Sequence, residues 1–197
     1  MEVKKIAVLG AGLMGHGITQ VAAQIGKYDV AMRDIDQKFI DNGMSMIRGS
    51  LQKFLGKGQI TEAEMNAVLA RIHPTLDLKE AVLKADLIIE AVPENVELKK
   101  AMFREVDTYA PDHAIIASNT SSISITEIAS ATKRPEKVCG MHFINPPQLM
   151  KLVEVIKGAK TSDETTQTIL EVAKRLEKET VLVKKDSPGF IVNRILI

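Results

Sequence analysis

Short apolar runs alternate along the chain with longer stretches in which apolar residues recur every three or four positions. The runs are rich in β-branched residues and are typical of buried parallel strands, at 5–9, 29–33, 85–92, 114–118, 138–142 and 152–156. Helical spacing lies between several of them, at 13–25, 36–55, 98–109 and 125–131. This alternation predicts an α/β fold with a doubly wound, Rossmann-type sheet.

The segment between the second and third predicted strands is longer than the single helix of a βαβ crossover requires. The helix predicted at 36–55 leads into the turn Gly56-Lys57-Gly58-Gln59. Thr61-Glu62-Ala63-Glu64 then has the pattern of a capping box that opens a second helix, through Val68 and Ile72. We expect an inserted antiparallel helical hairpin, which either reaches over a substrate or is a solvated surface element.

A glycine-rich turn follows the first predicted strand and precedes the first predicted helix. In a dinucleotide-binding turn of this spacing, Gly10 permits the tight turn, Gly12 lets phosphates approach and Gly15 allows helix and strand to pack closely. The helix N-terminus adds free N–H groups for the pyrophosphate. The candidate cofactor-binding residues here are Gly10, Ala11, Gly12, Leu13, Met14 and Gly15.

Asp34 follows the second predicted strand and lies 19 residues after Gly15. This is close to the spacing of about 20 for the acid that binds the adenosine ribose. Its carboxylate would accept hydrogen bonds from the ribose hydroxyls and repel a 2′-phosphate, so the predicted cofactor is NAD rather than NADP. The competing interpretation is a glycine-rich turn in an unrelated α/β protein.

One of the four histidines, His142, has a carboxylate that the predicted elements would bring close. His142 ends one predicted strand and Glu154 lies on the next, so the two side chains meet if those strands pair. A carboxylate that accepts the Nδ1 proton would leave Nε2 free to act as a base. The other three histidines, His16, His73 and His113, are expected to be structural or solvated. Cys139 is expected to be a core thiol.

Composition narrows the function classes. The 197 residues include 26 basic and 25 acidic side chains and only 4% aromatic residues, which does not fit the basic stripe and stacking rings of a nucleic-acid surface. The single cysteine, the absence of a signal peptide and the short apolar runs indicate a cytoplasmic protein. We expect neither a nucleic-acid nor a membrane partner, and no metal site.

Four segments together resemble the L-3-hydroxyacyl-CoA dehydrogenase family, which includes 3-hydroxybutyryl-CoA dehydrogenases. They are the glycine turn at 10–15, Ser118-Asn119-Thr120-Ser121-Ser122, the stretch 142–154, and Asp186-Ser187-Pro188-Gly189-Phe190-Ile191-Val192-Asn193-Arg194. The resemblance covers essentially the whole chain. It implies reversible, NAD-dependent oxidation of an L-3-hydroxyacyl-CoA to the 3-ketoacyl-CoA.

The resemblance also implies roles for individual residues. The catalytic set consists of a base, its carboxylate partner and two groups that hold the substrate oxygen: His142, Glu154, Ser121 and Asn193. Further cofactor contacts are implied for Glu94, Lys99, Ser121 and Asn145. Coenzyme A contacts are implied on the helical hairpin at Ser50 and Lys57, with Ser121 as a further substrate contact.

In such a family member, residues 1–185 form the dinucleotide-binding domain and 186–197 begin a C-terminal helical domain. We expect that domain to be truncated here, which would leave Phe190, Ile191, Ile195 and Leu196 without packing partners. The full-length protein is expected to be a homodimer. The activity of this piece alone is left open.

Three other functions are weighed against this one. A related sugar-acid dehydrogenase, of the L-gulonate type, would need no coenzyme A contacts. A serine-hydrolase triad of Ser121, His142 and Glu154 lacks a GxSxG elbow and leaves the glycine turn unexplained. A non-catalytic NAD-binding protein remains a third alternative, because a fold does not fix a function.

Overall fold

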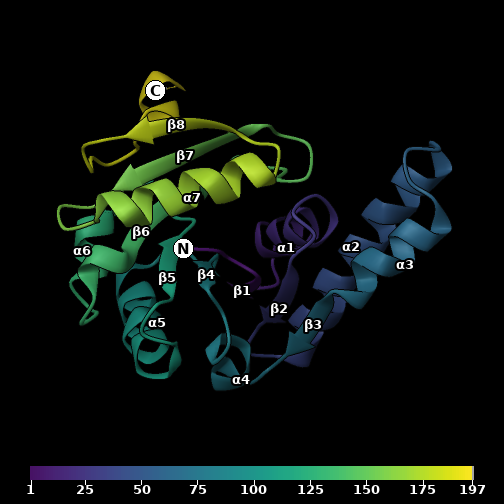
Figure 1. The fold of residues 1–197 in the computed structure, drawn as a ribbon, viewed down its shortest axis with the longest axis horizontal. Coiled ribbons are helices and arrows are strands. Elements are labelled where there is room, and N and C mark those ends of the chain that lie inside the picture. Colours follow the sequence, from purple (N-terminus) through teal and green to yellow (C-terminus); the bar gives the residue numbers. More distant parts are fainter. Residues whose placement is uncertain (197) are drawn as a thin grey trace.

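The computed structural model describes residues 1–196 and contains an eight-stranded sheet with helices on both faces (Figure 1). The strands are β1 (Lys5–Leu9), β2 (Asp29–Arg33), β3 (Ile72–Thr75), β4 (Leu87–Glu90), β5 (Ile115–Ser118), β6 (Val138–Phe143), β7 (Leu152–Lys157) and β8 (Glu179–Val183). Their order is β3-β2-β1-β4-β5-β6-β7-β8, and every neighbouring pair is parallel except β6 and β7. The first six strands have the order of a dinucleotide-binding Rossmann fold, so the predicted fold class is confirmed.

Two hydrophobic cores cover the two faces of the sheet. The helices are α1 (Gly15–Gln24), α2 (Gln37–Gly56), α3 (Glu62–Ala70), α4 (Leu78–Val82), α5 (Val96–Tyr109), α6 (Ile125–Ala129), α7 (Asp163–Arg175) and α8 (Val192–Leu196), with a 3-10 turn at Pro135–Lys137. One core contains side chains of α1, α2, α3 and α7, and the other those of α4, α5 and α6. Successive β1 residues point to opposite cores, Ile6 to the first and Ala7 to the second. Burial on both faces explains why these strands are apolar throughout.

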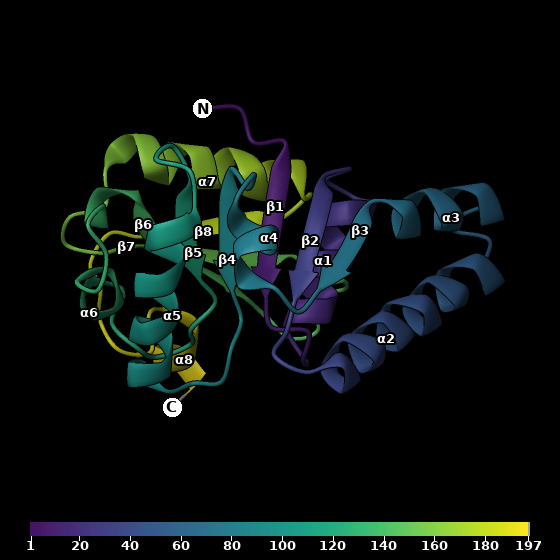
Figure 2. The same cartoon turned by 90° about the horizontal axis from the view of Figure 1, so that it is seen from below.

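Helices α2 and α3 form a hairpin that projects from one end of the sheet (Figures 1 and 2). Asp36 caps α2, since its carboxylate accepts a hydrogen bond from the Lys38 N–H at 2.8 Å. Thr61 and Glu64 form the predicted capping box at the start of α3. The inserted helical hairpin is thus confirmed. No helix within residues 1–196 combines the length and apolarity needed to cross a bilayer.

The structure corrects the end of the hairpin. Ile72, predicted to continue the second helix, begins the edge strand β3 instead. Pro74 lies two residues further on and favours extended backbone before it, which ends the helix at Ala70. The sequence analysis also missed β3, α4, α7 and β8. Strands β3 and β8 lie at the two edges of the sheet and carry exposed positions, so they lack the continuous apolar run of the inner strands.

Candidate active site

The glycine turn between β1 and α1 has no room for side chains at two of its positions. Gly10 has a φ of +110°, and a Cβ there would lie 2.6 Å from the carbonyl oxygen of Ala91. A Cβ on Gly15 would lie 1.7 Å from the carbonyl oxygen of Gly10. Gly12 differs, because nothing lies within 4 Å of a Cβ built on it. The turn is therefore tightly packed at Gly10 and Gly15 and leaves open space at Gly12.

The start of α1 and the end of β2 complete a cradle around that space. Met14 precedes α1 without a side-chain hydrogen bond to the helix, so no side chain caps its first N–H groups. Asp34 accepts hydrogen bonds from the N–H groups of Ala11 and Ile35, each at 2.7 Å. Leu13 is exposed. The space at Gly12, the uncapped helix and the adjacent carboxylate fit a dinucleotide with a free ribose diol.

His142 and Glu154 are direct partners in the antiparallel pairing of β6 with β7. Nδ1 of His142 lies 2.7 Å from Oε2 of Glu154, and the two residues are 7% and 0% exposed. A carboxylate can only accept this hydrogen bond, so Nδ1 carries the proton and Nε2 is left as the basic nitrogen. The predicted pairing of the two strands is confirmed.

A cavity of about 410 Å³ is lined by six of the site residues predicted from the sequence: Met14, Glu94, Ser121, His142, Asn145 and Asn193. It lies where β1, β4, β5 and β6 end, beside the glycine turn, as expected for a ligand site in an open α/β sheet. Its lining includes Met14, Glu94, Asn119, Ser121, His142, Asn145 and Asn193. Residues that are far apart in the sequence therefore face one space.

Glu94 occupies the center of a hydrogen-bond network at this cavity. Its Oε1 accepts hydrogen bonds from the N–H groups of Ser121 at 3.0 Å and Ser122 at 3.1 Å, and from the hydroxyl of Thr120. Burial alone would raise the pKa of Glu94, but the Thr120 hydrogen bond and the charge of Lys99 outweigh it and lower that pKa below its ordinary value. Glu94 is thus held as a fixed, ionised acceptor at the edge of the cavity.

Lys99 does not line this cavity. It is 1% exposed, and its Nζ lies 2.6 Å from Oε1 of Glu90 and 3.4 Å from Oε2 of Glu94. Lys99 thus contacts Glu94, which lines the cavity, from the interior of the protein. The cofactor contact implied for Lys99 stays a prediction. The sequence pattern was not used to predict a role for Glu90. Its only indication was a single carboxylate at the end of the apolar strand β4.

The segment around α8 closes one side of the cavity. Oε1 of Glu154 accepts hydrogen bonds from the N–H groups of Ile191 at 2.9 Å and Val192 at 3.0 Å. The side-chain amide of Asn193 donates to the carbonyl oxygen of Ser121 at 3.0 Å. Glu154 therefore contacts both the histidine and the segment that carries Asn193.

A triad of Ser121, His142 and Glu154 is not formed. Among the described residues, no hydrogen bond joins the hydroxyl of Ser121 to His142. The Ser121 hydroxyl instead lies 3.4 Å from Oε1 of Glu94. The arrangement lacks the nucleophile–base contact that acyl transfer by a serine needs.

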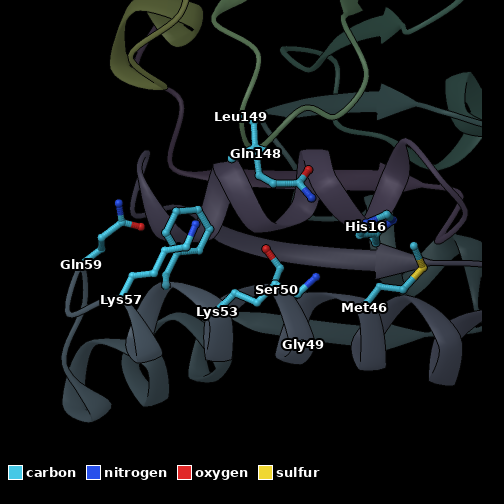
Figure 3. A pocket seen from close by; sticks show the side chains of 10 residues that line it. His16, Met46, Gly49, Ser50, Lys53, Lys57, Gln59, Gln148 and Leu149 are labelled. Carbon is cyan, nitrogen blue, oxygen red and sulfur yellow. The ribbon is translucent and has the colours of Figure 1, made fainter.

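Ser50 and Lys57 line a second cavity, of about 510 Å³, between α1, α2 and the loop from β6 to β7 (Figure 3). Ser121 belongs to the first cavity and not to this one. Two residues that the sequence analysis did not assign to a site, His16 and Gln148, also line the second cavity. Only the three-dimensional packing of α1 against the loop brings them there.

Two minor expectations can also be compared with the structure. Cys139 is a buried core residue as expected, and burial raises the pKa of its thiol to about 12. The expectation that His113 lacks a nearby carboxylate is wrong, because its Nε2 lies 2.9 Å from Oδ1 of Asp86. That pair joins the loop before β5 to the residue before β4, and the sequence spacing gave no sign of it.

Comparison with known proteins gives a consistent result. The family model described as 3-hydroxyacyl-CoA dehydrogenase, NAD binding domain, matches residues 5–187. Probable 3-hydroxybutyryl-CoA dehydrogenases of Bacillus subtilis and Deinococcus radiodurans are 46% identical over 197 residues and 48% identical over 193 residues. These alignments cover 100% and 98% of this chain, and 68% of each relative. The crystal structure of (S)-3-hydroxybutyryl-CoA dehydrogenase from Ralstonia eutropha matches 99% of this chain and 68% of that protein, with a TM-score of 0.95 and 40% identity.

Proposed function

The chain belongs to the 3-hydroxyacyl-CoA dehydrogenase family, as its NAD-binding domain, and on that premise we propose the reaction and the residues that perform it. The reaction is the reversible, NAD-dependent oxidation of an L-3-hydroxyacyl-CoA, such as 3-hydroxybutyryl-CoA, to the 3-ketoacyl-CoA. The observation that carries the proposal is the buried His142–Glu154 pair, whose histidine lines the same cavity as Met14 of the glycine turn.

His142 acts as the base in the oxidative direction. Its Nε2 takes the proton of the substrate hydroxyl while the carbon–oxygen double bond forms. Glu154 keeps the proton on Nδ1 and stabilises the imidazolium that results, since the two groups are 2.7 Å apart and out of solvent. In the reductive direction the same imidazolium returns the proton to the oxygen.

Ser121 and Asn193 hold the reacting oxygen. Both line the cavity with His142, and the amide of Asn193 already donates one hydrogen bond to the backbone of Ser121. The second N–H of Asn193 remains available to a ligand. The Ser121 hydroxyl can donate to the ligand by rotating away from its long contact, 3.4 Å, with Oε1 of Glu94. Hydrogen-bond donors held in place in this way stabilise the negative charge that develops on the substrate oxygen during the reaction.

The cofactor site consists of the cradle around Gly12 together with Asp34, Glu94 and Asn145. When bound there, NAD supplies the acceptor for the hydride that leaves the substrate carbon. Asp34 binds the adenosine ribose, while Glu94 and Asn145 face the end of the site nearest His142. Lys99 takes part through its ion pair with Glu94.

The second cavity favours a coenzyme A thioester over a free sugar acid. It adds about 510 Å³ of space lined by Ser50, Lys53 and Lys57 next to the glycine turn, which a small sugar acid would leave empty. Further parts of this proposal are residues 1–185 as the dinucleotide-binding domain and 186–197 as the beginning of a C-terminal helical domain. A cytoplasmic location, and a homodimer for the full-length protein, complete it. Light scattering after size-exclusion chromatography tests the dimer.

The function is tested by following NADH absorbance after acetoacetyl-CoA is added to the full-length protein. We expect oxidation of NADH that depends on both protein and thioester. Oxidation of L-gulonate with NAD and no reaction with acetoacetyl-CoA would identify the sugar-acid alternative. NADH binding without turnover of either substrate would identify a non-catalytic protein.

A further inference from the structure

The second cavity contains polar groups that the protein itself leaves without partners. His16 from α1 and Gln148 from the loop between β6 and β7 lie on one side of it, and Ser50 of α2 lies on the other (Figure 3). Buried donors and acceptors are normally paired within the protein or with water. Polar groups that face a cavity and have no partner within the protein are free to bind a ligand there.

His16 offers a hydrogen-bond acceptor to this cavity. The residue is 4% exposed, and its Nδ1 lies 2.8 Å from the carbonyl oxygen of Gly12. A carbonyl oxygen only accepts, so Nδ1 carries the ring proton and Nε2 of the neutral imidazole carries a lone pair. Nε2 forms no hydrogen bond within residues 1–196. The glycine turn thus fixes the tautomer of a histidine that lines the neighbouring cavity.

Gln148 offers a donor beside it. Its Oε1 is buried without a hydrogen-bond partner in the described chain and lies 2.7 Å from a Cβ built on Gly17, so the oxygen is packed against α1. In Figure 3 the side chain extends toward His16, with its nitrogen on the side of α2. The NH2 group and the imidazole therefore present one donor and one acceptor to the same space.

We propose that His16 and Gln148 recognise an amide of the pantetheine arm of the coenzyme A thioester, a step that rests on the proposed function. A secondary amide has one N–H and one carbonyl oxygen. The N–H donates to Nε2 of His16, and the carbonyl oxygen accepts from the NH2 group of Gln148. These two residues thereby favour a pantetheine thioester over a simple acid, which lacks such an amide.

The charges and apolar residues along the cavity agree with this position. Lys57 lies just after α2, at the end of the cavity away from His16, and Lys53 extends toward its middle (Figure 3). Ammonium groups on this side suit the phosphates of the coenzyme. At the other end, Met14 lies two residues before His16 and lines the cavity of His142. A thioester that runs from the lysines to the catalytic histidine therefore passes its amides beside His16.

The test measures the binding of acetoacetyl-CoA and of acetoacetyl-pantetheine, which lacks the nucleotide phosphates, by isothermal titration without NADH. His16→Ala and Gln148→Leu are each expected to raise the dissociation constant about three- to tenfold, the usual effect of losing one neutral hydrogen bond. The increase should be the same for both thioesters. The double variant should lose less than the product of the two single effects, because both residues hold one amide. His73→Ala, on edge strand β3 and outside the lining of the second cavity, is the matched control and should bind like wild type.

Separate outcomes distinguish the inference from the function it rests on. If wild type binds acetoacetyl-CoA but neither variant weakens it, the inference is wrong and the proposed function stands. A loss with acetoacetyl-CoA that disappears with acetoacetyl-pantetheine means that His16 binds phosphate, which also overturns the amide assignment. If wild type binds neither thioester, the proposed substrate class fails. If His16→Ala also weakens NADH binding, the effect of Gln148→Leu decides, because no hydrogen bond joins Gln148 to Gly12 among the described residues.

Discussion

Glu154 lies directly opposite His142 in the antiparallel ladder of β6 and β7, with Oε2 2.7 Å from Nδ1. The other carboxylate oxygen accepts two backbone N–H groups at the start of α8. One buried carboxylate therefore orients the proposed base and also fixes the segment that carries Asn193. This double use makes Glu154 the residue on which the geometry of the catalytic cavity depends most.

The first prediction concerns Glu154→Gln. The amide retains one acceptor for the His142 N–H or for the α8 backbone but cannot stabilise an imidazolium, so turnover should fall by at least about 10²-fold. NADH affinity should change little, since Glu154 does not line the cofactor cradle. Because His142 and Glu154 act as one unit, the double variant with His142→Gln should be scarcely slower than either single variant. Steady-state kinetics of the three variants measure this, and strictly additive losses would contradict it.

The second prediction concerns cofactor choice. Asp34 should make NADH bind at least about 10²-fold more tightly than NADPH, since unit charges about 4 Å apart repel by roughly 4 kcal/mol at an effective dielectric near 20, before screening. Asp34→Asn removes the charge and keeps an acceptor for the Ala11 N–H, although it loses the second acceptor, which binds the Ile35 N–H. Most of the preference should therefore vanish. Fluorescence titration with both cofactors measures it. Equal affinities in the wild type would remove Asp34 from this role.

The third prediction separates two glycines of the turn. Gly15→Ala places a Cβ against the Gly10 carbonyl and should lower the free energy of unfolding by about 1–3 kcal/mol or more. Gly12→Ala meets nothing in the protein, so its stability should stay within about 0.5 kcal/mol of wild type, while NADH affinity falls at least about tenfold because the methyl group fills the phosphate space. Gly56→Ala, also unobstructed and outside the turn, is the control. Unchanged NADH binding in Gly12→Ala would show that phosphates do not approach there.

The fourth prediction concerns the lone cysteine. Burial raises the pKa of Cys139 to about 12, so at pH 8 the thiol stays protonated and lacks the nucleophilic thiolate form. Iodoacetamide should therefore leave the folded protein unmodified and label it once it is unfolded in urea. Mass spectrometry of both samples checks this. Rapid labelling of the folded protein would mean that the core around β6 opens readily.

The central strands and the catalytic pair were predictable because their signals are local or follow from strand pairing. The apolar run at Lys5–Leu9 and the glycines after it define β1 and the turn without any long-range information. The His142–Glu154 contact needed only that two predicted strands be neighbours, and the register then places the residues opposite each other.

Other parts of the site depend on packing that a linear pattern does not contain. Edge strand β3 has only one buried residue, Ile72, so its periodicity is lost. Lysine side chains are normally exposed, but Lys99 is buried because its ammonium group pairs with the buried carboxylate of Glu90. His16 and Gln148 are 132 positions apart in the sequence, and only the packing of the β6–β7 loop on Gly17 brings them to one cavity.

The most direct test of the proposed mechanism is the turnover of acetoacetyl-CoA with NADH by His142→Gln. Removal of the proton-transferring imidazole should lower kcat by about 10²- to 10⁴-fold, and a parallel titration should show NADH affinity unchanged within about twofold, since the glycine turn and Asp34 are untouched. Near wild-type kcat in His142→Gln would contradict the assignment of His142 as the base, even if the family and cofactor assignments hold.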